Sequence, residues 1–141
     1  MKPLTTYHQE TKVYVHGVFD LFHYGHVKLL KEAKSLGDIL IVGLVTDANA
    51  KKIKGKTVLN YDERLEVISS IKYVDLVVEQ QTEDPTENLK LLDINILCRG
   101  EDYKGNPPGS DYMEISGGKV VRIPYSREIS STEIKRRILE E

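Results

Sequence analysis

The chain has 141 residues, which fits one globular domain that buries about two-thirds of the surface its unfolded chain exposes. Its net charge at pH 7 is −2, with 30% charged and 40% hydrophobic residues. This balance is typical of a soluble folded protein and excludes a disordered chain. Since there is no basic excess, the composition also argues against a dedicated nucleic-acid-binding protein.

The ends and the cysteine content indicate the compartment. Residues 1–11 lack the apolar core of a signal peptide, and no apolar stretch approaches the length of a membrane span. The only cysteine, Cys98, lies in an apolar run, which predicts a buried core thiol. We therefore expect one cytoplasmic domain over residues 1–141, with residues 1–11 as an N-terminal extension.

Short apolar runs alternate with helical patterns along the chain. Strands are predicted at residues 12–18, 39–45, 74–78, 94–99 and 119–123. Helices are predicted from Val27 to Leu36, after the Asn60 cap, after Asp84-Pro85, over 110–115 and from Ser130 to about Leu139. This order predicts an α/β fold with a five-stranded parallel sheet between two layers of helices.

Four polar segments follow predicted strands. They are the junction at residues 17–26, the lysine-rich loop at 46–56, the loop at 100–109 and the cap at Ser130. In parallel α/β sheets, ligands bind beyond the carboxyl ends of the strands, near the point where the strand order reverses. We therefore expect these segments to surround a binding site.

Two histidines in the first junction point to phosphate chemistry. His23 and His26 are three residues apart at the start of a predicted helix, so both imidazoles lie beside free backbone N–H groups, where phosphate binds. A zinc site is one alternative, but only Asp20 is near enough in sequence to add a ligand. Core packing is another, and it would need two buried polar partners. Gly17 fits the phosphate interpretation, because a missing side chain lets the backbone approach a ligand.

Residues 17–26 closely resemble the G-x-F-D-x-x-H-x-G-H signature of the cytidylyltransferase-like nucleotidyltransferases, a single-domain family with a Rossmann-like three-layer fold. The resemblance extends from Lys12 to Leu139. Residues 129–132, Ile-Ser-Ser-Thr, resemble the family's second signature, I-S-T-T or I-S-T-S, at the start of its last helix. Without the family, these serines would only be a helix cap, which is their commoner role.

The resemblance implies transfer of a nucleoside monophosphate from a nucleoside triphosphate to a phosphorylated alcohol or sugar, with release of pyrophosphate. It assigns catalysis to His23, His26 and Lys54. It assigns nucleotide binding to Gly17, Val18, Phe19, Asp20, Gly25, Arg64, Gly100, Asp102, Ser130, Ser131 and Thr132. A divalent ion, Mg²⁺, is implied by the triphosphate substrate and not by any cluster of protein ligands.

Three of these assignments have structural alternatives. The lysines at positions 51, 52, 54 and 56 are interpreted as a flexible cationic arm over phosphates, but a solvated basic loop has the same composition. Arg64 could form a salt bridge or reach the active site. Asp102 could border the nucleotide or cap a turn.

The nucleotide and acceptor remain open between two branches of the family. Residues 22–26, 54–60, 63–64 and 72–75 resemble the choline-, ethanolamine- and glycerol-phosphate cytidylyltransferases, which favours CTP. Residues 100–104, 109–110 and 117–118 resemble the adenylyltransferases that act on heptose 1-phosphate. In the R-T-E-G-I-S-T-T motif, Tyr125 stands where the nucleotide-contacting arginine belongs, and Arg127 follows two places later.

We predict a cytidylyltransferase that makes a CDP-alcohol or CDP-polyol. The alternatives are a sugar-phosphate adenylyltransferase and a nucleotide-binding module without catalysis. The predicted partners are a nucleoside triphosphate and a phosphorylated small-molecule acceptor, without nucleic acid or a membrane span. The resemblance also implies a homodimer, because family members commonly pair near the first signature.

Overall fold

The computed structural model describes residues 9–100, 105–124 and 129–140. Their centre is a five-stranded sheet in the order β3-β2-β1-β4-β5, and every neighbouring pair is parallel. The strands are β1 (Lys12–Gly17), β2 (Ile39–Val45), β3 (Leu76–Gln80), β4 (Ile96–Gly100) and β5 (Lys119–Ile123). From β1 the chain builds toward one edge and then crosses to the other, so the strand order reverses between β1 and β4.

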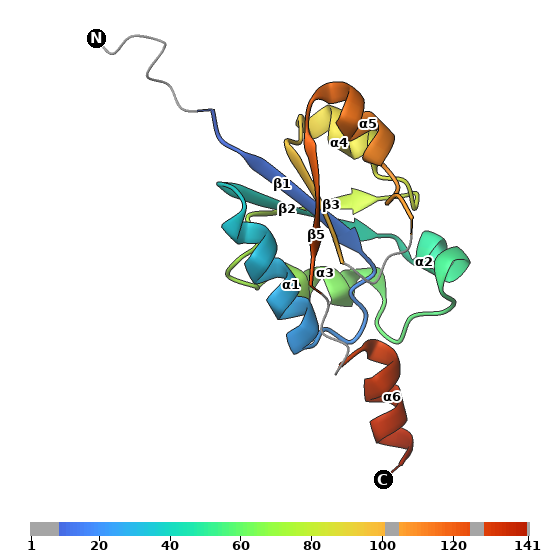
Figure 1. Ribbon diagram of the computed structural model, residues 1–141. Coiled ribbons are helices and arrows are strands. Elements are labelled where there is room, and N and C mark those ends of the chain that lie inside the picture. The colour runs from blue at the N-terminus through green and yellow to red at the C-terminus, as the bar shows by residue number, and fades with distance from the viewer. Residues whose placement is uncertain (1–8, 101–104, 125–128, 141) are drawn as a thin grey trace.

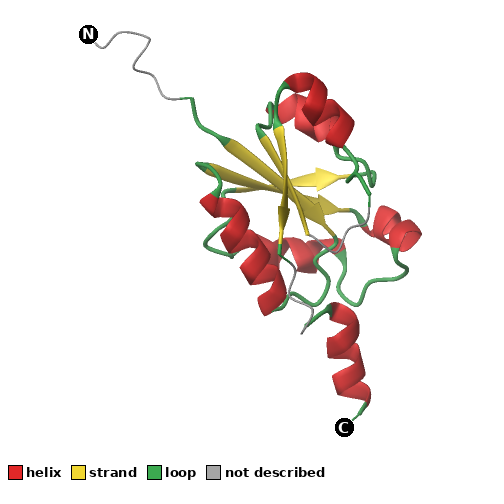
Figure 2. Ribbon diagram, viewed as in Figure 1, coloured by secondary structure: helices red, strands yellow, loops and turns green. Residues whose placement is uncertain are grey.

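Helices cover both faces of this sheet (Figures 1 and 2). They are α1 (Tyr24–Ser35), α2 (Asp47–Ile53), α3 (Tyr61–Ser69), α4 (Thr86–Leu92), α5 (Ser110–Ser116) and α6 (Ser131–Leu139). In Figure 1, α1 and α3 lie on one face and α4 and α5 on the other, while α6 extends away from the sheet. The predicted Rossmann-like three-layer fold is therefore confirmed.

The core has two parts, one on each face of the sheet. Val13 and Val15 of β1 pack with α1 residues on one face, whereas Tyr14 between them packs with Leu89 of α4 on the other. This alternation follows from the two-residue period of a strand whose faces are both covered. Cys98 belongs to the first cluster and is fully buried, as predicted, and burial raises the pKa of its thiol to about 12.

Two strands begin two residues later than predicted. β3 begins at Leu76 because the Asp75 carboxylate accepts a hydrogen bond from the backbone N–H of Leu40 and pairs with Lys34. β4 begins at Ile96 because the Asn95 side chain accepts from the backbone N–H of β1. At both positions one backbone hydrogen bond remains, from the N–H of Asp75 to the carbonyl of Leu40 and from the N–H of Asn95 to the carbonyl of Lys12. The side-chain oxygen accepts the N–H that runs the other way. The predicted strand at residues 119–123 coincides with β5.

The predicted loop at residues 46–56 is wrong in part, because it contains helix α2. Thr46 accepts a hydrogen bond from the backbone N–H of Asn49, which caps the helix, and Ala50 is buried beneath it. The buried Ala50 and the Thr46 cap therefore stabilise this short helix, which the lysine-rich composition of the segment does not predict. Lys51 and Lys52 are exposed residues of this helix. They do not belong to a flexible arm, as the sequence had suggested.

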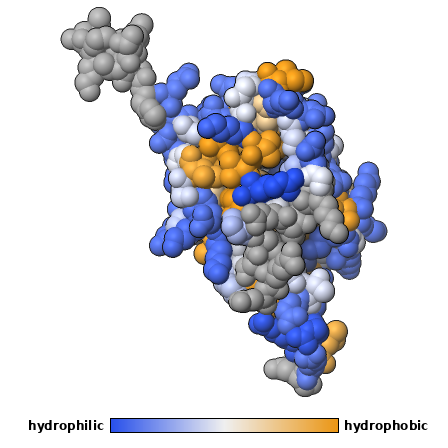
Figure 3. Space-filling view, in the orientation of Figure 1, coloured by the Kyte–Doolittle hydropathy of each residue, from blue (hydrophilic) through white to orange (hydrophobic). Residues whose placement is uncertain are grey.

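On the face shown in Figure 3, most of the coloured surface is hydrophilic. The largest hydrophobic patch on this face lies near its centre, over the edge strand β5, and smaller ones lie toward the margins. No helix in the described ranges is long and apolar enough to cross a membrane.

Candidate nucleotidyl-transfer site

The turn between β1 and α1 has a strained backbone that neighbouring segments hold in place. Phe19 and Leu21 have left-handed backbone angles, with φ values of 53° and 50°. Such angles are unfavourable for residues with side chains, and they cluster at functional sites. Asp20 lies between them with 1% exposure. Its carboxylate accepts the backbone N–H groups of Val58 and Leu59 at 2.8 and 2.9 Å.

Helix α1 begins at Tyr24, three residues before the predicted start, and both histidines build its first turn. His23 is the N-cap, and its Nδ1 accepts the backbone N–H of Gly25 at 3.1 Å. The Nδ1 of His26 accepts the backbone N–H of His23 at 3.2 Å. The two rings stack with centroids 3.8 Å apart, so the two side chains point the same way, as their three-residue spacing predicts. Core packing alone does not describe them, because both rings are only partly buried.

These hydrogen bonds determine which nitrogen of each ring carries a proton. Burial, followed by the charges of His23 and Lys54 and opposed by Asp20, lowers the pKa of His26 to about 3. Burial and then Lys54 also lower the pKa of His23. Both rings are therefore neutral at pH 7. Since each Nδ1 accepts a backbone N–H, each Nε2 carries the hydrogen and is a donor.

Gly25 makes room for the contact between the two signatures. A Cβ at this position would lie 3.0 Å from atoms of the His23 ring and 3.0 Å from Cγ2 of Ile129. A side chain at this position would push these neighbours aside by a few tenths of an ångström, so close packing favours glycine. The backbone angle is not left-handed and gives no separate reason for it. The missing side chain thus lets the first turn of α1 and the segment that leads into α6 approach closely.

A cavity of about 440 Å³ opens beside this turn, at the carboxyl ends of β1 and β4. Predicted site residues supply most of its lining: Gly17, Val18, Phe19, Asp20, His26, Lys54, Gly100 and Ser131. Lys54, the C-cap residue of α2, also lines the cavity. Burial, partly offset by the charge of Asp20, lowers the pKa of its amine. His23 does not line the cavity, but its ring stacks on that of His26, which does.

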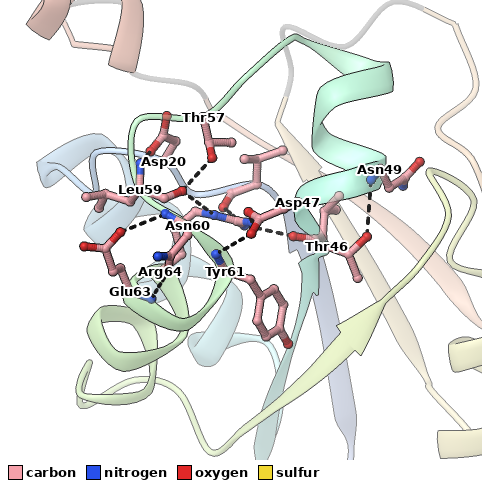
Figure 4. Close-up of polar contacts among 12 residues, drawn as sticks. Asp20, Thr46, Asp47, Asn49, Thr57, Leu59, Asn60, Tyr61, Glu63 and Arg64 are labelled. Carbon is pink, nitrogen blue, oxygen red and sulfur yellow. Dashed lines mark hydrogen bonds and ion pairs between the residues drawn. The ribbon is translucent and has the colours of Figure 1, made fainter.

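Arg64 is a buried structural cation and does not line this cavity. As Figure 4 shows, it joins separate segments of the chain. One guanidinium nitrogen donates to the backbone carbonyls of Val18 and Val45, both at 2.8 Å. Another pairs with Asp47 at 2.7 Å, and Nε donates to the carbonyl of Leu59 at 3.2 Å. Of the two roles considered for Arg64, the structure shows the salt bridge.

The second signature contributes unequally to the site. Ser130 caps α6, and its hydroxyl accepts the backbone N–H of Glu133 at 3.0 Å. Ser131 is buried, lines the cavity and donates a hydrogen bond to the backbone carbonyl of Asp20. Thr132 is exposed and does not line the cavity. The cap expected from the sequence is present, and Ser131 joins this signature to the first by a hydrogen bond.

Two polar residues of the cavity were not predicted as site residues. His16 has 6% exposure, and its Nε2 lies 3.4 Å from a guanidinium nitrogen of Arg99. Both residues lie within apolar strand segments, where polar side chains are uncommon unless they have a polar partner or a functional role. This pattern could have identified them as candidate site residues. Asp102, Tyr125 and Arg127 lie outside the described residues.

The described part of the chain provides few ligands for a metal ion. Among residues 9–100, 105–124 and 129–140, no group of three histidine, cysteine or acidic side chains could hold one. Among the residues that the structure describes, Asp20 is the only carboxylate in the cavity lining, and both its oxygens accept backbone N–H groups.

The fold and the site define a Rossmann-like α/β protein with a histidine- and lysine-lined cavity at its switch point. Residues 14–137 match the family model described as Cytidylyltransferase-like, and the chain belongs to this family. The family predicted from the two signatures is thereby confirmed.

This chain is similar to parts of relatives that have different names. The bifunctional protein HldE of Syntrophotalea carbinolica is 37% identical over 93% of this chain and 27% of its own length. The ethanolamine-phosphate cytidylyltransferase of Dictyostelium discoideum is 38% identical over 96% of this chain and 38% of its own length. The chain thus spans well under half of either relative. The crystal structure of the lipopolysaccharide core biosynthesis protein from Thermoplasma volcanium has a TM-score of 0.75 at 30% identity, covering 84% of this chain and 99% of that one.

Proposed function

We propose that this protein is a nucleotidyltransferase that transfers a nucleoside monophosphate to the phosphate of a small acceptor. The observation that carries the proposal is the histidine pair at the start of α1. It presents two neutral Nε2–H donors next to Lys54 at the carboxyl end of β1. Helix starts bind phosphate through their free N–H groups, and here imidazole donors are added.

In the proposed reaction, an oxygen of the acceptor phosphate attacks the α-phosphorus of the triphosphate. A new phosphorus–oxygen bond forms, the bond to the bridging oxygen breaks, and pyrophosphate leaves. Negative charge grows on the equatorial and leaving oxygens, so the reaction requires positioned donors and cations more than a base. His23 and His26 would donate to these oxygens, and Lys54 would neutralise the phosphates. Mg²⁺ bound to the triphosphate would supply further charge neutralisation.

CTP is the nucleotide that we favour, with an alcohol or polyol phosphate as acceptor. The resemblance at residues 22–26 and 54–60 supports it, and so does the similarity to an ethanolamine-phosphate cytidylyltransferase. A sugar-phosphate adenylyltransferase is the second candidate. It is favoured by the resemblance at residues 100–104 and by the similarity to a lipopolysaccharide core biosynthesis protein.

The direct test measures pyrophosphate release from CTP, ATP, GTP and UTP with Mg²⁺. The acceptors are ethanolamine phosphate, choline phosphate, glycerol 3-phosphate and heptose 1-phosphate. Turnover with CTP and an alcohol phosphate is expected. Turnover with ATP alone would replace the first candidate by the second, and nucleotide binding without turnover would favour a non-catalytic module. Lys54→Met should lower turnover strongly, whereas Lys52→Met, on the exposed side of α2, is the matched control.

We also propose that the protein works as a cytoplasmic homodimer. The dimer rests on the family resemblance near the first signature, where Tyr24 at the start of α1 is 46% exposed. Light scattering coupled to size exclusion measures the mass directly. A mass of twice 16.1 kDa is expected, and a mass equal to one chain would contradict the dimer.

A further inference from the structure

A chain of hydrogen bonds crosses the sheet behind the cavity and ends at His16. The amide nitrogen of Asn88 donates to the Tyr14 hydroxyl at 3.0 Å, and this hydroxyl is 2.6 Å from Oε1 of Gln80. Nε2 of Gln80 is 3.0 Å from Nδ1 of His16. Gly43 leaves the space for this chain, because a Cβ there would lie 1.9 Å from the tyrosine oxygen and 2.7 Å from Oε1 of Gln80.

Backbone carbonyls fix the direction of every bond in this chain. Nε2 of Gln80 also donates to the carbonyl of Thr82 at 2.9 Å and lies 3.4 Å from the carbonyl of Glu83, so its two hydrogens go to the two nearer acceptors, Thr82 and His16. The Asn88 nitrogen donates to the carbonyl of Glu79 at 3.1 Å. A flipped Gln80 would place its oxygen against a carbonyl oxygen, so its nitrogen must face Nδ1 of His16. Because the Tyr14 hydroxyl accepts from Asn88, its own hydrogen points to Gln80.

The protonation of His16 follows from this orientation. Burial, followed by the charge of Arg99 and opposed by Asp84, lowers the pKa of His16 to about 3, so the ring is neutral. Since Nδ1 accepts from Gln80, Nε2 carries the hydrogen. That hydrogen faces the cavity side, where a guanidinium nitrogen of Arg99 lies 3.4 Å from Nε2. Two donors at this distance do not bond to each other, and an anionic oxygen between them would satisfy both.

We propose that His16 and Arg99 form a second anion site in this cavity, which binds the phosphate of the acceptor, and that Gln80 positions His16 for this role. The acceptor assignment rests on the proposed nucleotidyl transfer.

The cavity has two separate groups of donors, His26 with Lys54 and His16 with Arg99. Their separation favours the acceptor phosphate, and not the triphosphate, as the ligand of His16 and Arg99. His26 and Lys54 enter the cavity from α1 and from the end of α2, whereas His16 and Arg99 enter from the adjacent strands β1 and β4. In-line transfer needs two phosphate-bearing substrates held by different groups in one cavity. His26 and Lys54 lie at the helix start, which suits the triphosphate. We therefore assign His16 and Arg99 to the acceptor phosphate.

The spectroscopic test uses the free protein and inorganic phosphate, and it does not depend on turnover. Long-range ¹H–¹⁵N spectra should show His16 as the Nε2–H tautomer in the wild type. Its ring signals should shift as phosphate is added, and Arg99→Gln should weaken that response by about tenfold. An Nδ1–H tautomer, or His16 signals that do not respond to phosphate, would overturn the proposal even if the enzyme is active.

The kinetic test uses two substitutions that differ in which ring nitrogen they imitate. His16→Asn places an amide near Nδ1 and removes the donor at Nε2, so KM for the acceptor should rise about tenfold while KM for the nucleotide changes less than about twofold. His16→Gln keeps a donor near Nε2 and should raise the acceptor KM less. Gln80→Leu should also raise KM for the acceptor. In this variant the ¹H–¹⁵N spectra should no longer show His16 as the Nε2–H tautomer alone. An equal rise in the nucleotide KM would assign the pair to the triphosphate and overturn the proposal.

Absence of pyrophosphate release with every substrate pair would contradict the proposed function. The phosphate titration would then decide the anion site by itself. If His16→Asn does not fold, the wild-type spectra still give the tautomer and the phosphate response.

Discussion

The hydroxyl of Ser131 donates a hydrogen bond to the backbone carbonyl of Asp20 and so ties the last helix to the first turn of the site. The two residues are 111 positions apart, and both are buried. The acceptor belongs to a turn whose flanking residues, Phe19 and Leu21, have left-handed backbone angles. The two family signatures are thus one structural unit, in which α6 stabilises a strained turn.

Ser131→Ala should therefore destabilise the protein by about 1 to 2 kcal/mol, because the buried carbonyl of Asp20 loses its donor. Urea unfolding measures this difference. Thr132→Ala, at an exposed neighbouring position, is the control and should leave the midpoint nearly unchanged. Equal midpoints for Ser131→Ala and the wild type would show that the hydrogen bond does not hold the turn.

Asp20→Asn should release the segment that follows Lys54. An amide has a single oxygen acceptor, whereas the carboxylate accepts the N–H groups of both Val58 and Leu59. Hydrogen exchange at these two amides should accelerate by roughly tenfold or more, since one charge-assisted bond is lost. The amides of β2 provide the internal reference. Unchanged exchange at Val58 and Leu59 would contradict the anchoring role of Asp20.

Arg64→Met should cost about 3 kcal/mol or more of stability, because it leaves three backbone carbonyls without their buried donor. Arg64→Lys should recover only part of this loss, since an ammonium cannot reproduce the planar fork of donors. Arg136→Gln, on exposed α6, is the surface control and should have little effect. A small loss for Arg64→Met in urea unfolding would mean that the buried guanidinium is dispensable.

Acid should destabilise the fold through His16. Its pKa is about 3 in the folded protein, below the usual 6.5, because of burial and Arg99. The unfolded chain therefore binds the extra proton first, and stability is lost as the pH falls from about 6.5 toward 3. The slope approaches about 1.4 kcal/mol per pH unit below the unfolded pKa. Carboxylates also titrate in this range, so the measurement is the difference between wild type and His16→Gln. Parallel pH profiles would contradict the neutral buried ring.

The sequence allowed prediction of the features that depend on local chemistry. The Asn60–Glu63 capping box, the histidine pair and the extent of β5 all agree with the structure. These features follow from contacts within a few residues or from a strand's hydrophobic pattern, so a single sequence contains enough information to find them.

Features that depend on distant contacts could not be predicted in the same way. Helix α2 is stabilised by one buried alanine and one cap within a lysine-rich segment. The His16–Gln80 contact joins residues 64 positions apart, and Asp20 finds its partners 38 and 39 positions away. Spacing along the chain does not reveal which buried polar groups meet, because only the sheet order brings them together.

The central claim is that the His23 and His26 imidazoles stabilise the transferring phosphate, and His23→Asn tests it most directly. Asparagine also caps helices, so this variant keeps the start of α1 and removes only the ring. The measurement is kcat for pyrophosphate release, with urea unfolding as the check on stability. We predict a loss of roughly a hundredfold or more in kcat at nearly unchanged stability. A stable variant with wild-type kcat would contradict the assignment.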